Sequence, residues 1–166
     1  SASYESSVAT GVEFEPNNSV DSAQPIDSSV AIEGSLFASE DRDWFSIEID
    51  TPSAINILFE SASQEYVDWR LSFYDPQGDV VDSINCEGVS CVSEGVSLEM
   101  IAIDKGVFFV VVESSSVDDY PRGTYTLEVN SSVLPDTPGI PRNLSASQGS
   151  SLDTIYLEWE DRQAGN

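Results

Sequence analysis

The chain contains no histidine, only two cysteines and only six basic residues among 166. Without histidine it lacks the usual general base near neutral pH and the imidazole ligand of many metal sites. Two thiols are too few for a cysteine-rich zinc site. The sequence has no glycine-rich phosphate loop and no apolar run long enough to cross a bilayer. These absences argue against the common catalytic mechanisms and against a membrane-spanning protein.

Acidic residues dominate the charge of the chain. Thirty Asp and Glu against six Lys and Arg give a formal net charge of -24 at pH 7. Such a surface repels nucleic-acid phosphates and anionic membranes, so neither is expected as a partner. Cations and basic, neutral or polyhydroxylated molecules fit better. Salt would screen the self-repulsion of the carboxylates, which suits a secreted protein.

The length and the first residues bear on domain organisation. With 166 residues, 40% of them hydrophobic, the chain can form one well-buried domain with residues to spare. The sequence does not open with a signal peptide. We therefore expect a piece of a longer exported protein.

Short segments with strand-like alternation follow one another from residue 30 onward. No segment of ten or more residues shows a helical period, so the sequence predicts an all-β, antiparallel two-sheet sandwich. The expected strands are residues 30–36, 43–49, 54–60, 67–75, 79–84, 97–103, 106–114 and 123–129.

Alternation within these segments also predicts the core. One face of four strands carries the residues Phe45, Ile47, Ile49, Ile55, Ile57, Phe59, Trp69, Leu71, Phe73, Tyr125, Leu127 and Val129. The segment 106–114 is apolar on both faces, which is typical of a central strand covered on each side. Phe109 and Val111 are therefore predicted to be buried as well.

The two cysteines stand close together in "INCEGVSC". The four residues between Cys86 and Cys91 can turn, so a disulfide is geometrically easy and would indicate an oxidising compartment. The alternative is a pair of reduced, partly buried thiols.

Composition divides the chain into four parts. Residues 1–12 suit a linker or leading segment, 13–130 form the sandwich, 131–141 form a Pro-rich linker, and 142–166 restart strand-like alternation. The last part, with "NLSAS" and "IYLEW", resembles the truncated start of a fibronectin type III domain. Its apolar side chains cannot close a core alone. We expect them to pack on their own sandwich or on a neighbouring molecule, which would give a dimer.

A broader resemblance covers residues 13–130. Its five blocks, in order, are "EFEPNNSVDSAQPI", "GSLFASEDRDWFSIEI", "LSFYDPQGDVV", "KGVFFVVVESSS" and "YPRGTYTLEV". Together they resemble the bacterial pre-peptidase C-terminal domain, whose relatives include the collagen-binding modules of clostridial collagenases. The resemblance implies a jelly-roll-like β-sandwich attached to a secreted protease or another exported hydrolase.

The first block concentrates oxygen ligands, which hard cations such as calcium require. By position, the resemblance implies calcium as the cofactor, with ligands Glu13, Glu15, Asn17, Asn18, Glu40 and Asp43, and Asp41 as a substitute for Glu40. Relatives often carry an acid where Asn18 stands, and the amide would weaken binding. The alternative is that Asn17 and Asn18 cap a turn while residues 40–43 are simply solvated.

Catalysis is not expected. Asp41 and Asp43 could serve as a carboxylate pair in glycoside hydrolysis. However, thirty acids in 166 residues make such a pair common by chance, and no other catalytic arrangement is present.

Aromatic and basic residues opposite the core predict a binding surface. The candidates are Trp44, Tyr66, Arg70, Tyr74 and Tyr120, unless a loop or the tail covers them. The predicted function is a non-catalytic accessory module, linked to the catalytic domain of a secreted hydrolase, that binds insoluble extracellular protein such as collagen. The alternatives are a carbohydrate-binding module that takes polysaccharide, and a structural spacer or folding aid without a ligand.

Overall fold

A computed structural model of the chain describes residues 9–38, 40–62, 68–86, 91, 95–115, 123–135, 142–146 and 157–160. The chain divides into two compact units, residues 1–133 and residues 134–166. Among the described residues, no helix is long and apolar enough to span a membrane.

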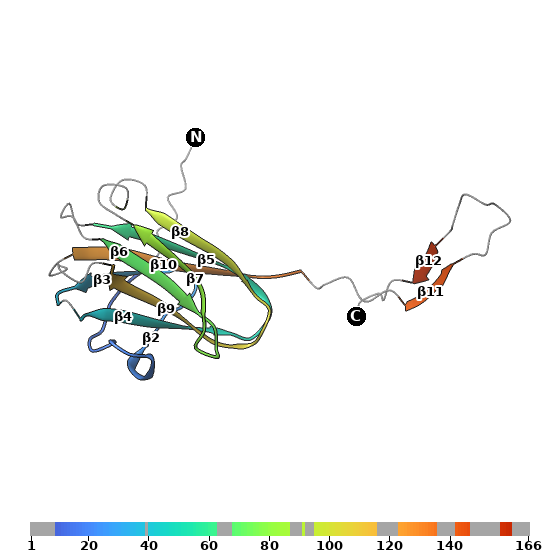
Figure 1. Cartoon of the computed structure of the whole chain (residues 1–166), viewed down its shortest axis with the longest axis horizontal. Helices are drawn as coiled ribbons and strands as arrows, with labels where there is room; N and C mark the ends of the chain where they lie inside the picture. Colours follow the sequence, from blue (N-terminus) through green and yellow to red (C-terminus); the bar gives the residue numbers. More distant parts are fainter. Residues whose placement is uncertain are drawn as a thin grey trace. The chain divides into compact units, whose positions relative to one another are not determined.

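The first unit is a β-sandwich of two five-stranded sheets in the described part of the chain (Figure 1). Sheet A has the strand order β1-β3-β10-β5-β8, and sheet B has the order β2-β4-β9-β6-β7. All neighbours are antiparallel except the pairs β1–β3 and β2–β4, which are parallel. The predicted all-β two-sheet sandwich is confirmed. The strands are β1 (Ala9–Val12), β2 (Gln24–Pro25), β3 (Val30–Leu36), β4 (Arg42–Ile49), β5 (Ser53–Ser61), β6 (Trp69–Tyr74), β7 (Val80–Cys86), β8 (Val96–Ala102), β9 (Gly106–Ser114) and β10 (Gly123–Val133), with a 3-10 helix η1 (Val20–Ser22).

The core lies between the two sheets and follows the predicted alternation. All twelve residues expected on the inner faces of β4, β5, β6 and β10 are buried. Strand β9 is central in sheet B, as its apolar composition predicts. The prediction for Phe109 is wrong, because β9 turns Phe108, Val110 and Val112 inward and leaves Phe109 half-buried on the outer face. A run of apolar residues has no alternation from which the inner face could be chosen.

A tight turn joins β6 to β7. The Asp75 Oδ1 atom accepts hydrogen bonds from the backbone N–H groups of Gln77 (2.9 Å) and Asp79 (2.8 Å). Gly78 has a φ of 87°, a conformation that favours glycine. This turn fixes the register of the hairpin at the edge of sheet B.

Cys86 and Cys91 form a disulfide with a Cα–Cα distance of 5.6 Å, and both are buried. The bond joins the end of β7, in sheet B, to the connection that leads to β8 in sheet A.

The second unit contains the antiparallel pair β11 (Arg142–Ala146) and β12 (Leu157–Glu160). Leu144, Leu157 and Trp159 lie in these strands, whereas Ile155 lies outside the described residues.

Candidate metal centre

The candidate site begins where β1 ends. The Glu13 N–H donates to the Glu33 carbonyl oxygen at 3.0 Å, which continues the pairing of β1 with β3. The Glu13 Oε2 atom accepts a hydrogen bond from the Ser35 N–H at 2.8 Å. The backbone and the carboxylate of Glu13 are therefore both anchored to β3.

Gln24, in the short strand β2, holds the same segment from the side of sheet B. Its Nε2 atom donates to the Val12 carbonyl oxygen at 3.1 Å, and its Oε1 atom accepts from the Phe14 N–H at 2.7 Å. The amide thus bonds to the backbone on both sides of Glu13. Sequence reasoning missed this role, because no local pattern marks a glutamine whose partners lie ten and twelve residues away.

Asn17 and Asn18 fasten the loop to β4 on both sides of Asp43. The Trp44 N–H donates to the Asn17 carbonyl oxygen at 2.9 Å, and the Arg42 N–H donates to the Asn18 Oδ1 atom at 3.0 Å. Asn17 is fully buried, and its Nδ2 atom donates to the Glu13 Oε1 atom at 3.2 Å. The two asparagines therefore bring the loop carboxylates to Asp43.

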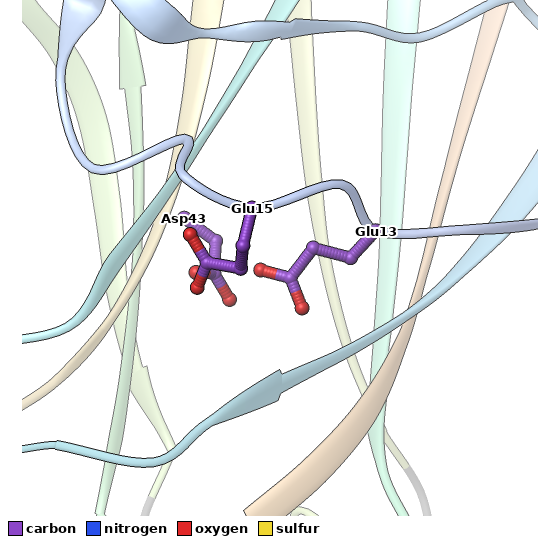
Figure 2. Close-up of side chains that lie close together, drawn as sticks. All are labelled: Glu13, Glu15 and Asp43. Atoms are coloured by element: carbon purple, nitrogen blue, oxygen red, sulfur yellow. The ribbon is translucent and has the colours of Figure 1, made fainter.

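Glu13, Glu15 and Asp43 each place a carboxylate oxygen within 4.8 Å of the others. Figure 2 shows the three carboxyl groups converging from the loop and from β4. Asp43 is fully buried, and its Oδ2 atom accepts a hydrogen bond of 2.6 Å from the Tyr125 hydroxyl. The Tyr125 ring occupies the space above Gly34, where a Cβ atom would collide with it. Gly34 therefore sets the position of the tyrosine beneath the site.

Burial and neighbouring carboxylates raise the pKa values of three groups at the site. Burial raises the pKa of Asp43 from 3.8 to about 9, with further contributions from a hydrogen bond with Glu13 and from the charge of Asp41. Burial, followed by the charges of Asp41 and Glu13, also raises the pKa of Glu15. Burial and the neighbouring Asp43 raise the pKa of Tyr125 well above 10. Burial is the largest cause of all three shifts, and the neighbouring carboxylates add to each.

Two buried oxygen atoms at the site have no hydrogen-bond partner among the described residues. They are the Oδ1 atoms of Asn17 and Asp43. A buried acceptor without a partner costs about 1–3 kcal/mol. The atoms available as metal ligands are carboxylate and amide oxygens, without nitrogen or sulfur. This set of ligands fits a hard cation better than a transition metal.

Glu40 and Asp41 lie outside the group of three converging carboxylates. Glu40 is exposed. The Asp41 Oδ2 atom accepts a hydrogen bond from the Phe37 N–H at 2.8 Å, which closes the turn before β4. The structure therefore brings Glu13, Glu15 and Asp43 together, with Asn17 and Asn18 beside them.

The outer face of sheet B carries the predicted binding residues that the structure describes. The ring of Trp44 lies 5.2 Å from that of Tyr74 and 6.0 Å from that of Phe109, between ring centroids. Arg70 lies four residues before Tyr74, on the same face of β6, and its Nε atom donates to the Asn85 Oδ1 atom at 3.0 Å. Tyr66 and Tyr120 lie outside the described residues. Phe109 joins the cluster although sequence reasoning placed it in the core.

Comparisons with known proteins bear on the fold. No protein-family profile matches the chain. Over 76 residues, or 46% of its length, the chain is 36% identical to collagenase ColA of Clostridium perfringens, of which it spans 7%. The solved pre-peptidase C-terminal domain of a Bacillus anthracis collagenase matches 65% of this chain and 94% of its own, with a TM-score of 0.50 and 19% identity. The sandwich has the fold of a pre-peptidase C-terminal domain.

The same architecture occurs in a protein of different description. Aeromonas hydrophila PliG, a periplasmic lysozyme inhibitor, matches 75% of this chain and all of its own, with a TM-score of 0.51 and 11% identity. Because such folds serve several functions, the role of this pre-peptidase C-terminal fold has to be argued from its surfaces.

Proposed function

We propose that the chain is a non-catalytic accessory module of a secreted multidomain hydrolase, a protease, and that it binds insoluble protein such as collagen. The observation that carries this proposal is the cluster of Trp44, Tyr74 and Phe109 on the outer face of sheet B. The partial identity to a collagenase and the collagenase-domain fold support it. The disulfide supports an extracellular location, since such bonds persist in oxidising compartments.

We define the aromatic face as Trp44, Tyr74, Phe109, Arg42 and Arg70 on the outer side of sheet B. Arg42 forms an ion pair of 3.1 Å with Glu113, and Trp44 lies two residues further along β4. Strands β5, β8 and β10 of sheet A contain no basic residue. In an otherwise acidic molecule, the aromatic face therefore offers rigid rings and fixed guanidinium groups to a neutral, extended polymer.

We also propose that the metal centre binds calcium through Glu13, Glu15, Asn17 and Asp43. Calcium takes six to eight oxygen ligands, and the unpartnered Oδ1 atoms of Asn17 and Asp43 would gain a partner. Bound calcium would supply positive charge to the three crowded carboxylates.

Strand β4 connects the two proposed sites. Asp43 is buried beside the loop carboxylates, whereas Arg42 and Trp44, its neighbours in β4, belong to the aromatic face. The backbone N–H groups of Arg42 and Trp44 donate to Asn18 and Asn17 of the metal loop. Loss of the cation would therefore loosen the support of two residues of the aromatic face.

Carbohydrate binding is the second candidate, because the same pair of rings, Trp44 and Tyr74, could stack on sugars. Sedimentation of the protein with collagen fibrils and with insoluble polysaccharides distinguishes the candidates. We expect binding to collagen, and at least a tenfold loss in a Trp44→Ala/Tyr74→Ala variant, since each aromatic anchor contributes about 1–2 kcal/mol.

Phe37→Ala is the matched control, because Phe37 is an aromatic residue that is 68% exposed outside the aromatic face. Equal binding by the double variant and the wild type would contradict the role of this face. Binding to polysaccharide alone would favour the carbohydrate-binding module. No binding to either polymer would favour a spacer.

A further inference from the structure

The outer face of sheet A has two hollows that follow one another along strand β5. One hollow of about 570 Å³ is lined by residues that include Ala54, Asn56, Glu99 and Ile101. A second hollow of about 340 Å³ follows it along β5 and is lined by residues that include Leu58, Glu60 and Glu128. We call the two together the sheet A groove. Residues 54–60 of an extended strand span about 20 Å.

Carboxylates recur in this groove with the period of a β-strand. Asn56 lies beside Glu99, Leu58 lies beside Glu128, and Glu60 lies beside Thr126 of β10. Across β8, β5 and β10, three successive rows therefore each carry one acid, and the rows are about 7 Å apart. An extended chain repeats its side chains on one face at the same interval.

The groove also offers hydrogen-bond acceptors and apolar contacts. The Asn130 Nδ2 atom donates to the Glu128 Oε1 atom at 2.9 Å and so holds that carboxylate in place. The Asn56 Oδ1 atom is enclosed and has no hydrogen-bond partner among the described residues. The side chains of Leu58 and Ile101 are 40% and 64% exposed. Lysine and arginine combine an apolar stem with a donor at the tip, which matches this arrangement.

We propose that the sheet A groove binds an extended polypeptide segment with lysine or arginine at alternate positions. Charge complementarity favours this occupant, because β5, β8 and β10 contain no basic residue. A second copy of the chain would bring the same acidic face and be repelled. Outward positions of β5 are Ala54, Asn56, Leu58 and Glu60, so the floor has no ring on which a sugar could stack. The proposal is independent of the function proposed for the aromatic face, which lies on the other sheet.

The test uses the full chain and a fluorescent peptide with lysine at every second position and serine between, at physiological salt. A peptide of the same composition with its lysines contiguous is the comparator. We expect the alternating peptide to bind about tenfold more tightly, because only its spacing matches the three rows. In NMR spectra, the backbone amide chemical shifts that change on addition of the peptide should belong mainly to β5, β8 and β10.

Two double variants separate the groove from general attraction by the negative chain. Glu99→Gln/Glu128→Gln removes two charges from the groove, and Glu48→Gln/Asp50→Asn removes two exposed charges outside it. We expect about tenfold weaker peptide binding in the first and less than a twofold change in the second. Equal losses in both variants, or equal affinity for the two peptides, would overturn the proposal.

A third variant tests the groove even if the Glu99→Gln/Glu128→Gln protein does not fold. Ala54→Arg places a bulky cation in the larger hollow, and circular dichroism verifies that the sandwich remains folded. We expect it to abolish the preference for the alternating peptide. Retention of that preference by a folded Ala54→Arg protein would also refute binding in the groove.

Discussion

Replacing Asp43 with asparagine should change the stability of the protein in a direction that depends on whether a metal ion is bound. Asp43→Asn keeps the shape of a fully buried side chain and removes one of three carboxylates that lie within 4.8 Å of one another. The new amide oxygen can still accept the hydrogen bond from the Tyr125 hydroxyl. The amide Nδ2 group that takes the place of the Asp43 Oδ1 atom can donate to Glu13 at any pH, whereas Asp43 must be protonated to do so.

In the presence of chelator, the variant should therefore be the more stable protein. An uncompensated buried polar group costs about 1–3 kcal/mol, so we expect a gain of about 2 kcal/mol in the free energy of unfolding. This gain corresponds to a rise of about 6 °C in Tm. In calcium at about one hundredfold above its Kd, the wild type should gain about 2.7 kcal/mol, and the variant should gain little because it has lost a ligand. Calcium should thus reverse the order of stability.

Thermal unfolding by circular dichroism, in chelator and in calcium at matched ionic strength, measures both effects. Asp50→Asn is the control, because it removes an exposed carboxylate outside the site. Sodium at the same ionic strength should not reproduce the calcium shift if the effect is site-specific. The reasoning fails if Asp43→Asn is less stable than the wild type in chelator, or if its calcium response is unchanged.

Three further predictions concern pH, the disulfide and the tail. The pKa of Asp43 in the metal-free folded protein, about 9, lies above its ordinary value of 3.8, so the stability that it contributes is complete below pH 3.8 and is lost as the pH rises toward 9. The urea midpoint of the metal-free wild type should fall over this window and that of Asp43→Asn should fall less; parallel curves would contradict the role of Asp43. Replacing Cys86 and Cys91 with serine should lower the free energy of unfolding by about 2 kcal/mol, the chain-entropy value for so short a loop. Urea titration measures this free energy, and an unchanged value in the variant would contradict the prediction. Deleting residues 135–166 should leave a folded monomer, since the first unit is compact by itself. If the tail mediates a dimer, sedimentation should detect association of the full chain but not of the truncated chain. A dimer of the truncated chain would exclude the tail as the interface.

The sequence was informative wherever side-chain alternation was clear. The inner faces of β4, β5, β6 and β10 follow from the period of two, because most of their inward positions are apolar and most of their polar residues lie on the other side. The resemblance to collagenase modules implied that Glu13 and Glu15 lie near Asp43. No local rule links residues about thirty positions apart, so the alternation of the strands could not have predicted it.

Other features depend on long-range geometry. Strand β2 is only two residues long and pairs in parallel with β4, so it has no period to detect. Gln24 acts on Val12 and Phe14 only after β1 and β2 have been placed in different sheets. Phe109 could not be assigned to a face because its neighbours are apolar on both sides. The groove on sheet A requires the pairing of β10 with β5, whose partners lie more than sixty residues apart.

The disulfide between Cys86 and Cys91 has a consequence for survival among proteases. It spans the point at which the chain leaves β7 of sheet B for β8 of sheet A. A protease that cuts any peptide bond between the two cysteines would produce two polypeptides that remain covalently joined. Both pieces would keep their strands in the sandwich, since β8 still pairs with β5 and β7 with β6. The break would appear in electrophoresis only after reduction, so the sandwich could be nicked there without coming apart.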